Sequence, residues 1–350
     1  MMSFRGHRLA ETRPPQGTIW LLEALAECKG RQALHERQSP QILKALRELA
    51  LVESAESSNR IEGVTVERDR LRPLVLGHSH PRDRSEEEIV GYRRALAWIH
   101  TDHRKIPIEP ETIRRLHALA QAGTSGDAGE WKRLPNDIIE VHPDGRREVR
   151  FRPLAPELVP AAMEELCVAY RHAVDQLEVT SLLATAALVL DFLCIHPFRD
   201  GNGRVGRLIT LLVLYHHGHE VGRYISLERI VEQTKESYYE ALKRSSEGWH
   251  EARHDIVPWF NYLLSTVRVA YREFEERAGR ERPRRGSKAD LVAYALENVP
   301  SPFGIADVER LCPNVSRDTI RAVMNRWRKA GRLEILGRGR DARWRVVRRE

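Results

Sequence analysis

The sequence lacks the features that mark membrane-spanning, secreted, disulfide-stapled and zinc-bound proteins. No apolar run approaches the roughly 18 residues of a membrane helix, and the start, MMSFRGHRLAETRPPQG, has no apolar segment of the secretory type. Internal repeats, low-complexity tracts and the P-loop pattern GxxxxGK(S/T) are also absent. Four cysteines are scattered without paired spacing, so neither a disulfide framework nor a zinc site is expected: Cys28, Cys167, Cys194 and Cys312. We therefore expect a cytoplasmic protein without membrane contact.

The composition is that of a globular, helix-rich protein. With 350 residues, 41% hydrophobic and 31% charged, the chain can form one large domain with smaller ones attached. Its net charge of +7 is uneven, because residues 277–350 hold 19 Lys and Arg against 9 Asp and Glu, whereas residues 1–276 hold 38 against 41. The basic C-terminal part favours an acidic partner such as nucleic acid.

Apolar periodicity and capping signals predict helices along most of the first 277 residues. Residues 1–19 are expected to wrap over the surface. One segment breaks the helical pattern, since Ile138–Val141 and Glu148–Phe151 are typical of two short strands around a His-Pro-Asp-Gly turn. A lone hairpin is only marginally stable, so this one must rest on the helices. The expected helices cover about residues 20–35, 40–62, 85–101, 110–122, 155–175, 179–195, 203–218, 235–248 and 254–277.

The basic C-terminal part has a pattern of its own. A polar linker, RAGRERPRRGS, precedes three helical segments that begin at Ser287, Gly304 and Ser316. Two short strand candidates, RLEIL and ARWRVV, follow on either side of Gly337–Asp341. Three helices and a basic hairpin resemble a winged helix-turn-helix domain, in which the third helix enters the major groove of DNA and the hairpin loop is the wing.

Polar groups interrupt an apolar helical run in CIHPFRDGNGRVGRLITLLVLYHHG, residues 194–218. A helix ends near Ile195, and the chain turns through glycines before a new helix begins. The free amides at a helix N-terminus form an anion site suited to phosphates. Arg204 and Arg207 lie three residues apart, so they share a face, lean toward that N-terminus and can chelate phosphate oxygens.

Asp200 and His196 lie in the same stretch as the two arginines and the glycine turn. A carboxylate beside an anion site would be repelled unless a cation such as Mg²⁺ joins it to the phosphates. His196 is the group that can take a proton near neutral pH. The residues together predict a site for nucleotide phosphates and one metal ion, with a base that activates an incoming hydroxyl.

HPFRDGNGRVGR, His196 to Arg207, resembles the full signature HxFx(D/E)GNGRxxR of the Fic family (filamentation induced by cAMP), and every fixed position is satisfied. The resemblance extends over about residues 105–272. It implies transfer of AMP from ATP, with Mg²⁺, to a Ser, Thr or Tyr hydroxyl of a protein, the chain itself included. It also implies a role for each signature residue: His196 as the base, Asp200 for Mg²⁺, Gly201, Asn202 and Gly203 as the anion hole, Arg204 on the α and β phosphates, Arg207 on the γ phosphate, and Phe198 as a buried anchor of the loop.

A second stretch, SSNRIEG, resembles the family's inhibitory motif (S/T)xxxE(G/N) through Ser58, Glu62 and Gly63. It lies upstream of the signature on an expected helix, as in the class with an N-terminal inhibitory helix. This resemblance implies that Glu62 pairs with Arg207, denies it to the γ phosphate and leaves ATP in a non-productive pose.

Further resemblances concern the walls of the site. The expected hairpin resembles the family's flap, whose strand edge holds the target segment by β-augmentation. In TKESYYEALKRSSEG, Tyr239 falls at the aromatic position beside adenine, whereas Tyr238 is better explained as a core residue. Ser246 stands where several family members have Asn.

These observations predict an all-α protein: a Fic helical fold with a small β-hairpin flap, an N-terminal helical inhibitory region and a C-terminal winged helix-turn-helix domain. The expected boundaries are 1–104 for the N-terminal region, 105–272 for the Fic core, 273–286 for a linker and 287–350 for the winged helix. The histidines of YHHGH follow a helix end, where cationic side chains favour the helix dipole, so a metal site is not assigned to them.

The predicted function is protein adenylylation that is inhibited by Glu62. Two alternatives stay open: removal of AMP from a modified protein, with Glu62 aligning a water, and a DNA-binding regulator whose Fic fold senses nucleotide. The intact His196 argues against the regulator, which needs no base. DNA is a possible partner of the C-terminal domain, and a homodimer is left open by the sequence.

Overall fold

The structure, a computed structural model of the whole chain, describes residues 1–36, 40–123, 126–141, 145–279, 289, 292, 293, 295, 296, 299, 302–312, 315–337 and 342–347. The chain forms two compact units, Met1–Ala278 and Gly279–Glu350. None of the helices in the described ranges is both long and apolar enough to cross a membrane.

The first unit is almost entirely helical, which confirms the expected fold class. Its helices are α1 (Gln16–Glu36), α2 (Pro40–Ile61), α3 (Arg68–Val75), α4 (Arg84–Asp102), α5 (Pro110–Ala120), α6 (Val159–Asp175), α7 (Ser181–Ile195), α8 (Asn202–His216), α9 (Leu227–Gln233), α10 (Lys235–Ser246) and α11 (Val257–Gly279). Three short 3-10 helices cover His103–Lys105, Pro156–Leu158 and Glu220–Arg223. Neither α3 nor α9 was expected from the sequence, because helices of seven or eight residues span too few turns to show a clear period.

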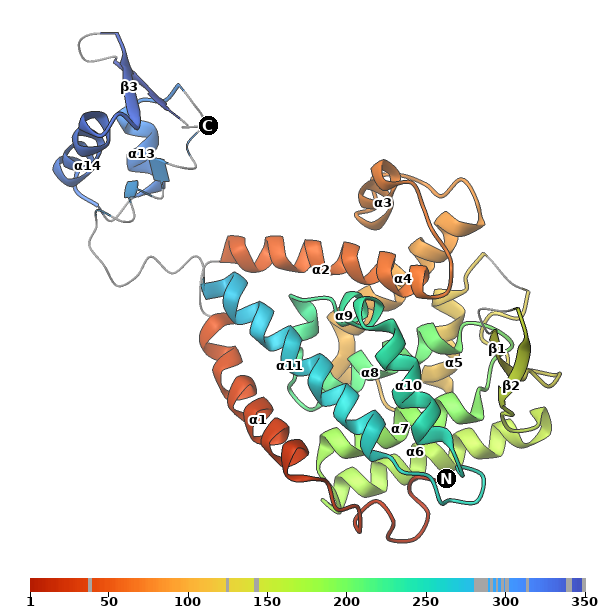
Figure 1. The fold of residues 1–350 in the computed structure, drawn as a ribbon. Coiled ribbons are helices and arrows are strands. Elements are labelled where there is room, and N and C mark those ends of the chain that lie inside the picture. Colours follow the sequence, from red (N-terminus) through yellow and green to blue (C-terminus); the bar gives the residue numbers. More distant parts are fainter. Residues whose placement is uncertain are drawn as a thin grey trace. The chain divides into compact units, whose positions relative to one another are not determined.

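The core is built on the consecutive helices α7 and α8, which pack against each other (Figure 1). Every residue of α7 except Ser181 and Leu193 is buried, as is typical of a helix that is apolar all round. Thr180 caps its start by accepting a hydrogen bond from the Leu183 amide at 3.3 Å. Helix α8 also packs against α2, α4 and α5, so its N-terminus is held by elements far apart in sequence.

A two-stranded antiparallel hairpin, β1 (Ile138–Val141) and β2 (Arg147–Phe151), interrupts the helices as the sequence predicts. It rests on the helical body in two places. Phe151 packs against the hydrophobic core, and Glu140 on β1 forms an ion pair with Lys243 on α10 at 2.9 Å. These contacts supply the stability that an isolated hairpin lacks.

The structure corrects two expectations about the ends of this unit. The N-terminal segment does not simply wrap the surface: Ser3 is buried, and its amide and hydroxyl donate to the buried Asp191 carboxylate on α7 at 3.0 and 2.6 Å. The linker expected at 273–286 begins later, because Phe274 and Ala278 are buried and continue α11 to Gly279. The remaining domain boundaries stay predictions.

The second unit contains α13 (Ile305–Leu311), α14 (Arg317–Lys329) and an antiparallel hairpin of β3 (Leu333–Leu336) and β4 (Arg343–Val346). Ser316 caps α14 by accepting from the Thr319 amide at 3.4 Å. The other edge of β4 bonds to Phe303 through two backbone hydrogen bonds with Trp344, at 2.9 and 2.8 Å. Much of the expected first helix of this unit, and most of the expected wing at 337–341, lie outside the described residues.

Candidate active site

The connection from α7 to α8 turns sharply at two residues with positive φ. His196 ends α7 with φ +52°, and Gly201 precedes α8 with φ +76°. Between them Phe198 is fully buried, and its ring stacks on His117 at 3.8 Å between centroids with 2° between planes. Phe198 is therefore the loop anchor that the sequence predicts.

Asn202 holds the loop with its side chain rather than presenting it to a ligand. Its Oδ1 accepts from the Phe198 amide at 2.9 Å, and its Nδ2 donates to the Phe198 carbonyl at 2.8 Å. Asn136 donates to that same carbonyl at 2.8 Å. No side chain caps α8, so the backbone amides of Asn202 and Gly203 begin the helix without a capping oxygen. Such an N-terminus favours an anion.

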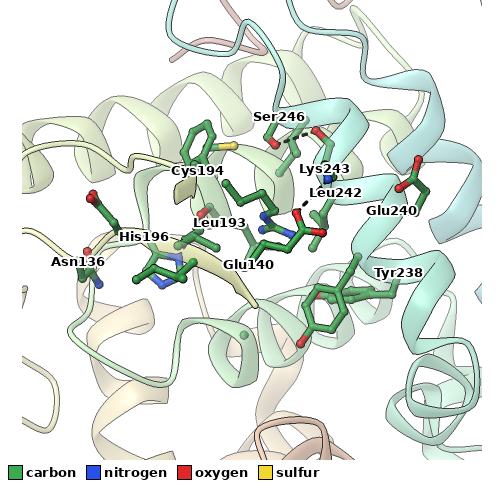
Figure 2. Close-up of a pocket in the computed structure, with 18 of the residues that line it drawn as sticks. Asn136, Glu140, Leu193, Cys194, His196, Tyr238, Glu240, Leu242, Lys243 and Ser246 are labelled. Atoms are coloured by element: carbon green, nitrogen blue, oxygen red, sulfur yellow. Dashed lines mark hydrogen bonds and ion pairs between the residues drawn. The ribbon is translucent and has the colours of Figure 1, made fainter. Parts of the chain in front are cut away.

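His196 faces a cavity of about 780 Å³, a size suited to a small-molecule ligand. Figure 2 shows His196 and Asn136 on one side, the α10 residues Lys243 and Ser246 on the other, and Glu140 of the hairpin between them. The lining residues are Glu62, Asn136–Glu140, Arg150, Phe151, Leu190, Leu193, Cys194, His196, Arg199, Gly203, Arg207, Glu236, Tyr238–Glu240, Leu242, Lys243 and Ser246.

The surroundings of His196 favour its neutral form. Burial is the main cause that lowers the pKa of the imidazole to about 4; the positive charges of Lys132 and Arg150 act in the same direction, and the hydrogen bond to the Leu193 carbonyl opposes them. Nδ1 lies 3.2 Å from that carbonyl, which fixes it as the donor. Because Nδ1 carries the proton, Nε2 is left with a lone pair, and none of the described residues bonds to it. The ring can therefore accept a proton at neutral pH.

Arg207 is buried and held by the end of α2. Its Nη2 lies 2.7 Å from Glu62 Oε1 and donates to the Ser58 carbonyl at 2.9 Å, while its Nε donates to Ser58 Oγ at 2.9 Å. The ion pair between Glu62 and Arg207 that the sequence predicts is thus present. Two residues of the (S/T)xxxE(G/N) stretch, Ser58 and Glu62, bind one guanidinium.

Gly203 makes room for this carboxylate. A Cβ atom at Gly203 would lie 2.4 Å from Glu62 Oε1 and 3.2 Å from Arg207 Nη1. The first of these distances is too short for a real Cβ atom, so any larger residue at this position would push the Glu62 carboxylate away from the first turn of α8.

Arg204 differs from its expected position. Only 2% of the residue is exposed, it does not line the cavity, and its Nη1 donates to Glu88 Oε2 on α4 and to Asn59 Oδ1 on α2 at 2.5 and 3.2 Å. The charge of a buried arginine requires a carboxylate partner, and Glu88 supplies it. In this structure Arg204 ties α8 to α2 and α4.

Asp200 is the residue expected to bind Mg²⁺, and its surroundings fit that role. Its carboxylate is 68% exposed, one oxygen accepts from the Gly201 amide at 2.6 Å, and the other lies 3.8 Å from Arg204. The described residues contain no group of three or more His, Cys, Asp or Glu side chains placed to share a metal ion. One carboxylate suits Mg²⁺ in nucleotide sites, where substrate phosphates and water supply the other ligands.

The two neighbouring tyrosines divide as the sequence predicts. Tyr238 is 5% exposed and packs edge-on against Trp259 at 5.5 Å, whereas Tyr239 is 37% exposed and lines the cavity. Ser246 also lines the cavity, where its hydroxyl donates to the Lys243 carbonyl at 3.0 Å. An aromatic wall on α10 is therefore available to stack on a base.

The structure adds residues that no sequence pattern revealed. Lys132 is buried below the loop and donates to Asn136 Oδ1 at 2.9 Å and to the Ile195 carbonyl at 3.3 Å; burial lowers its pKa to about 8. Glu88, Asn136 and Arg150 likewise come from segments distant from the signature. Apolar flanks and residue spacing do not predict such partners, because tertiary packing determines which distant residues meet.

The histidines of YHHGH contact separate partners instead of converging. His216 lies 2.7 Å from the His103 carbonyl, His217 lies 2.8 Å from the Tyr170 hydroxyl, and His219 lies 3.1 Å from the Tyr271 hydroxyl. Within the described ranges, they form no metal site.

Known proteins resemble this chain in sequence and in fold. Residues 107–214 match the model of the Fic/DOC family. A Fido domain-containing protein of Dictyostelium discoideum is 29% identical over 121 residues, which cover 35% of this chain and 80% of that protein. The ribonucleoside-diphosphate reductase small chain of Ostreid herpesvirus 1 is 26% identical over 153 residues, and the match spans only 26% of that protein.

Solved structures extend the likeness beyond the matched residues. A Fic family protein of Desulfovibrio desulfuricans has a TM-score of 0.65 at 19% identity, covering 97% of this chain and 99% of that one. A Fic domain-containing signaling protein of Bacteroides thetaiotaomicron has a TM-score of 0.61 at 23% identity, covering 75% and 98%. The helical fold is thus one that solved Fic proteins share. In sequence, residues 107–214 match the Fic/DOC family domain.

Proposed function

We propose that this protein transfers AMP from ATP to a hydroxyl of a protein and that Glu62 holds this activity down. The observation that carries the proposal is the neutral His196 on the wall of a cavity that it shares with Arg207, whose guanidinium is occupied by Glu62. A base beside an anion site is the arrangement that phosphoryl and nucleotidyl transfer require. The match of residues 107–214 to the Fic/DOC family model supports the same reaction class.

In the proposed reaction, His196 Nε2 takes the proton of the acceptor hydroxyl while the hydroxyl oxygen attacks the α phosphorus of ATP. The bond from that phosphorus to the bridging oxygen breaks, and pyrophosphate leaves with the electron pair. The amides at the start of α8 and Arg207 bind phosphate oxygens, and Tyr239 stacks on the base. Asp200 would hold Mg²⁺, which would supply charge neutralisation for the phosphates.

The hairpin is proposed to receive the target segment. Ile139 and Val149 face each other across β1 and β2, and both are exposed, at 42% and 41%. An exposed apolar pair beside the cavity gives an extended peptide a surface to pack on, and a strand edge supplies backbone hydrogen bonds.

The test is incubation of wild type, His196→Ala and Glu62→Gly with α-³²P-ATP and Mg²⁺ in a cell lysate. Label on a protein that depends on His196 and increases with Glu62→Gly supports the proposal. Removal of AMP from a premodified protein by wild type, lost with Glu62→Gly, would instead establish the reverse reaction, with Glu62 aligning the attacking water. Absence of label with all three proteins, together with ATP binding, would favour the nucleotide-sensing regulator.

A second proposed activity concerns the C-terminal unit. Arg321, Asn325 and Arg328 are exposed on α14, on the side away from the buried Ile320, Val323, Met324 and Trp327. Arg and Asn are the side chains that bind guanine and adenine in the major groove by paired hydrogen bonds. We propose that α14 binds duplex DNA, which makes this chain a Fic protein with a nucleic-acid partner.

A further inference from the structure

Arg150, on β2, differs from the paired cations that line the cavity. Lys243 pairs with Glu140 at 2.9 Å, and Arg207 pairs with Glu62 at 2.7 Å. Among the described residues the side chain of Arg150 has no ion pair and no hydrogen bond, and its Nε is buried without a partner. A buried donor that is left unpaired costs free energy, which a ligand with an acceptor group can recover.

The backbone around Arg150 is fixed in advance. The next residue, Phe151, packs into the core and stacks on His250 at 5.3 Å between centroids with 12° between planes. His250 Nε2 donates to the carbonyl of Arg152 at 2.8 Å. The backbone that carries Arg150 is therefore anchored to the core. Binding of a ligand by the guanidinium would have little backbone left to order.

Arg150 also lies within electrostatic reach of both ends of the cavity. Its charge adds to the burial that lowers the pKa of His196, and with Arg207 it opposes the rise that burial causes in the pKa of Tyr239. Under the proposed function, the acceptor meets His196 and the base stacks on Tyr239. The phosphates of the nucleotide must then pass between these two residues.

We infer that Arg150 is a phosphate ligand contributed by the hairpin, outside the signature sequence. This inference rests on the proposed function, because its ligand is the triphosphate of the same nucleotide. Arg204 is directed to Glu88 and away from the cavity. Arg150 thus complements Arg207 in binding the phosphates, and it ties nucleotide binding to the hairpin that receives the target.

The test uses the full chain carrying Glu62→Gly and measures the affinity for ATP, ADP and adenosine by calorimetry with Mg²⁺ present. Arg150→Ala should weaken ATP binding about 10- to 100-fold, the loss expected for one charge-assisted phosphate contact, and should leave adenosine binding unchanged. Arg150→Lys, which keeps the charge but loses the planar fork, should fall between. Arg147→Ala is the matched control, since Arg147 lies on the same strand, is exposed and does not line the cavity; ATP affinity should not change.

Three outcomes overturn the inference. Unchanged ATP affinity in Arg150→Ala with loss of transfer to a protein target would assign Arg150 to an acidic group of that target. An equal loss of ATP and adenosine binding, or a lowered melting temperature shared by Arg150→Lys, would make Arg150 a structural residue. If the Glu62→Gly protein without further substitutions does not bind ATP, both the proposed function and this inference are overturned. Measuring this protein alone distinguishes that outcome from the other two.

Discussion

Glu62 Oε1 lies 2.7 Å from Arg207 Nη2, and the same carboxylate oxygen occupies the space beside the α carbon of Gly203. A single carboxylate, on the residue that follows α2, thus covers both the second arginine of the signature and the first turn of α8. Under the proposed function phosphates would bind these two features, and a nucleotide could then not use them fully while Glu62 is in place. The contact is charge-assisted and partly shielded from water, since the Arg207 side chain is only 6% exposed.

We expect Glu62→Gly to raise AMP transfer by about tenfold or more, because a pair of this kind is worth roughly 1.5–3 kcal/mol and would no longer compete with phosphate. Arg207→Ala should remove most of that gain, since the released guanidinium would be absent. The two substitutions should therefore be strongly non-additive in a double-mutant cycle of initial labelling rates. The control is Glu56→Gly, because Glu56 lies on α2 ahead of Glu62 and pairs with Arg60 rather than with Arg207. Equal rates for Glu62→Gly and wild type would reduce Glu62 to a helix-end residue.

His196→Ala should abolish transfer while ATP still binds, because the phosphate contacts come from α8 and the arginines. Loss of a positioned base typically costs about 10²- to 10⁴-fold in rate. The rate is measured by single-turnover labelling in the Glu62→Gly background, and binding by calorimetry. Activity within a few-fold of the parent would show that His196 is a structural histidine.

The pH profile should report the lowered pKa of His196. Its imidazole accepts a proton only when neutral, so acid removes the activity. With a pKa of about 4 in the free enzyme, kcat/KM should stay level from pH 8 to near 5 and fall below that. An unperturbed histidine would lose half of its activity at about pH 6.5. A midpoint near that value, measured with the Glu62→Gly protein, would mean that the cavity is more hydrated than its packing indicates.

The sequence predicted those parts of the site that depend on local order. The turn and the hairpin follow from glycine and strand signals within a few residues, and the anchor Phe198 is implied by the signature that contains it. The pairing of Glu62 with Arg207 was predicted only because a family pattern links two distant segments. Local sequence patterns alone do not indicate which side chains meet across the core.

The contacts of Arg204 illustrate what the sequence did not predict. Its spacing from Arg207 places both arginines near one end of α8, but spacing does not reveal that Glu88, 116 positions earlier, is buried beside Arg204. Lys132 and Arg150 were missed for the same reason, since neither sits in a recognisable pattern. The short helices α3 and α9 depend on tertiary packing more than on their own periodicity.

The C-terminal unit should bind duplex DNA with an affinity that falls steeply as salt rises, because its Lys and Arg side chains displace counterions from phosphates. Using the full chain and fluorescence anisotropy with a pool of labelled duplexes, Arg321→Ala should weaken binding about tenfold, in line with the 1–3 kcal/mol of a base or phosphate contact on a recognition helix. Arg338→Ala, in the expected wing and outside the described residues, should weaken it through the second contact that a wing makes.

Arg171→Ala removes an equal charge from an exposed position of the first unit, so it tests whether net charge alone explains the effect. Unchanged binding in Arg171→Ala beside weakened binding in Arg321→Ala would locate the contact on α14. If Arg321 contacts a base, its loss should also relax sequence preference; if it contacts a phosphate, the salt slope should fall by about one. No binding at low salt would show that the basic face of α14 recognises a protein instead.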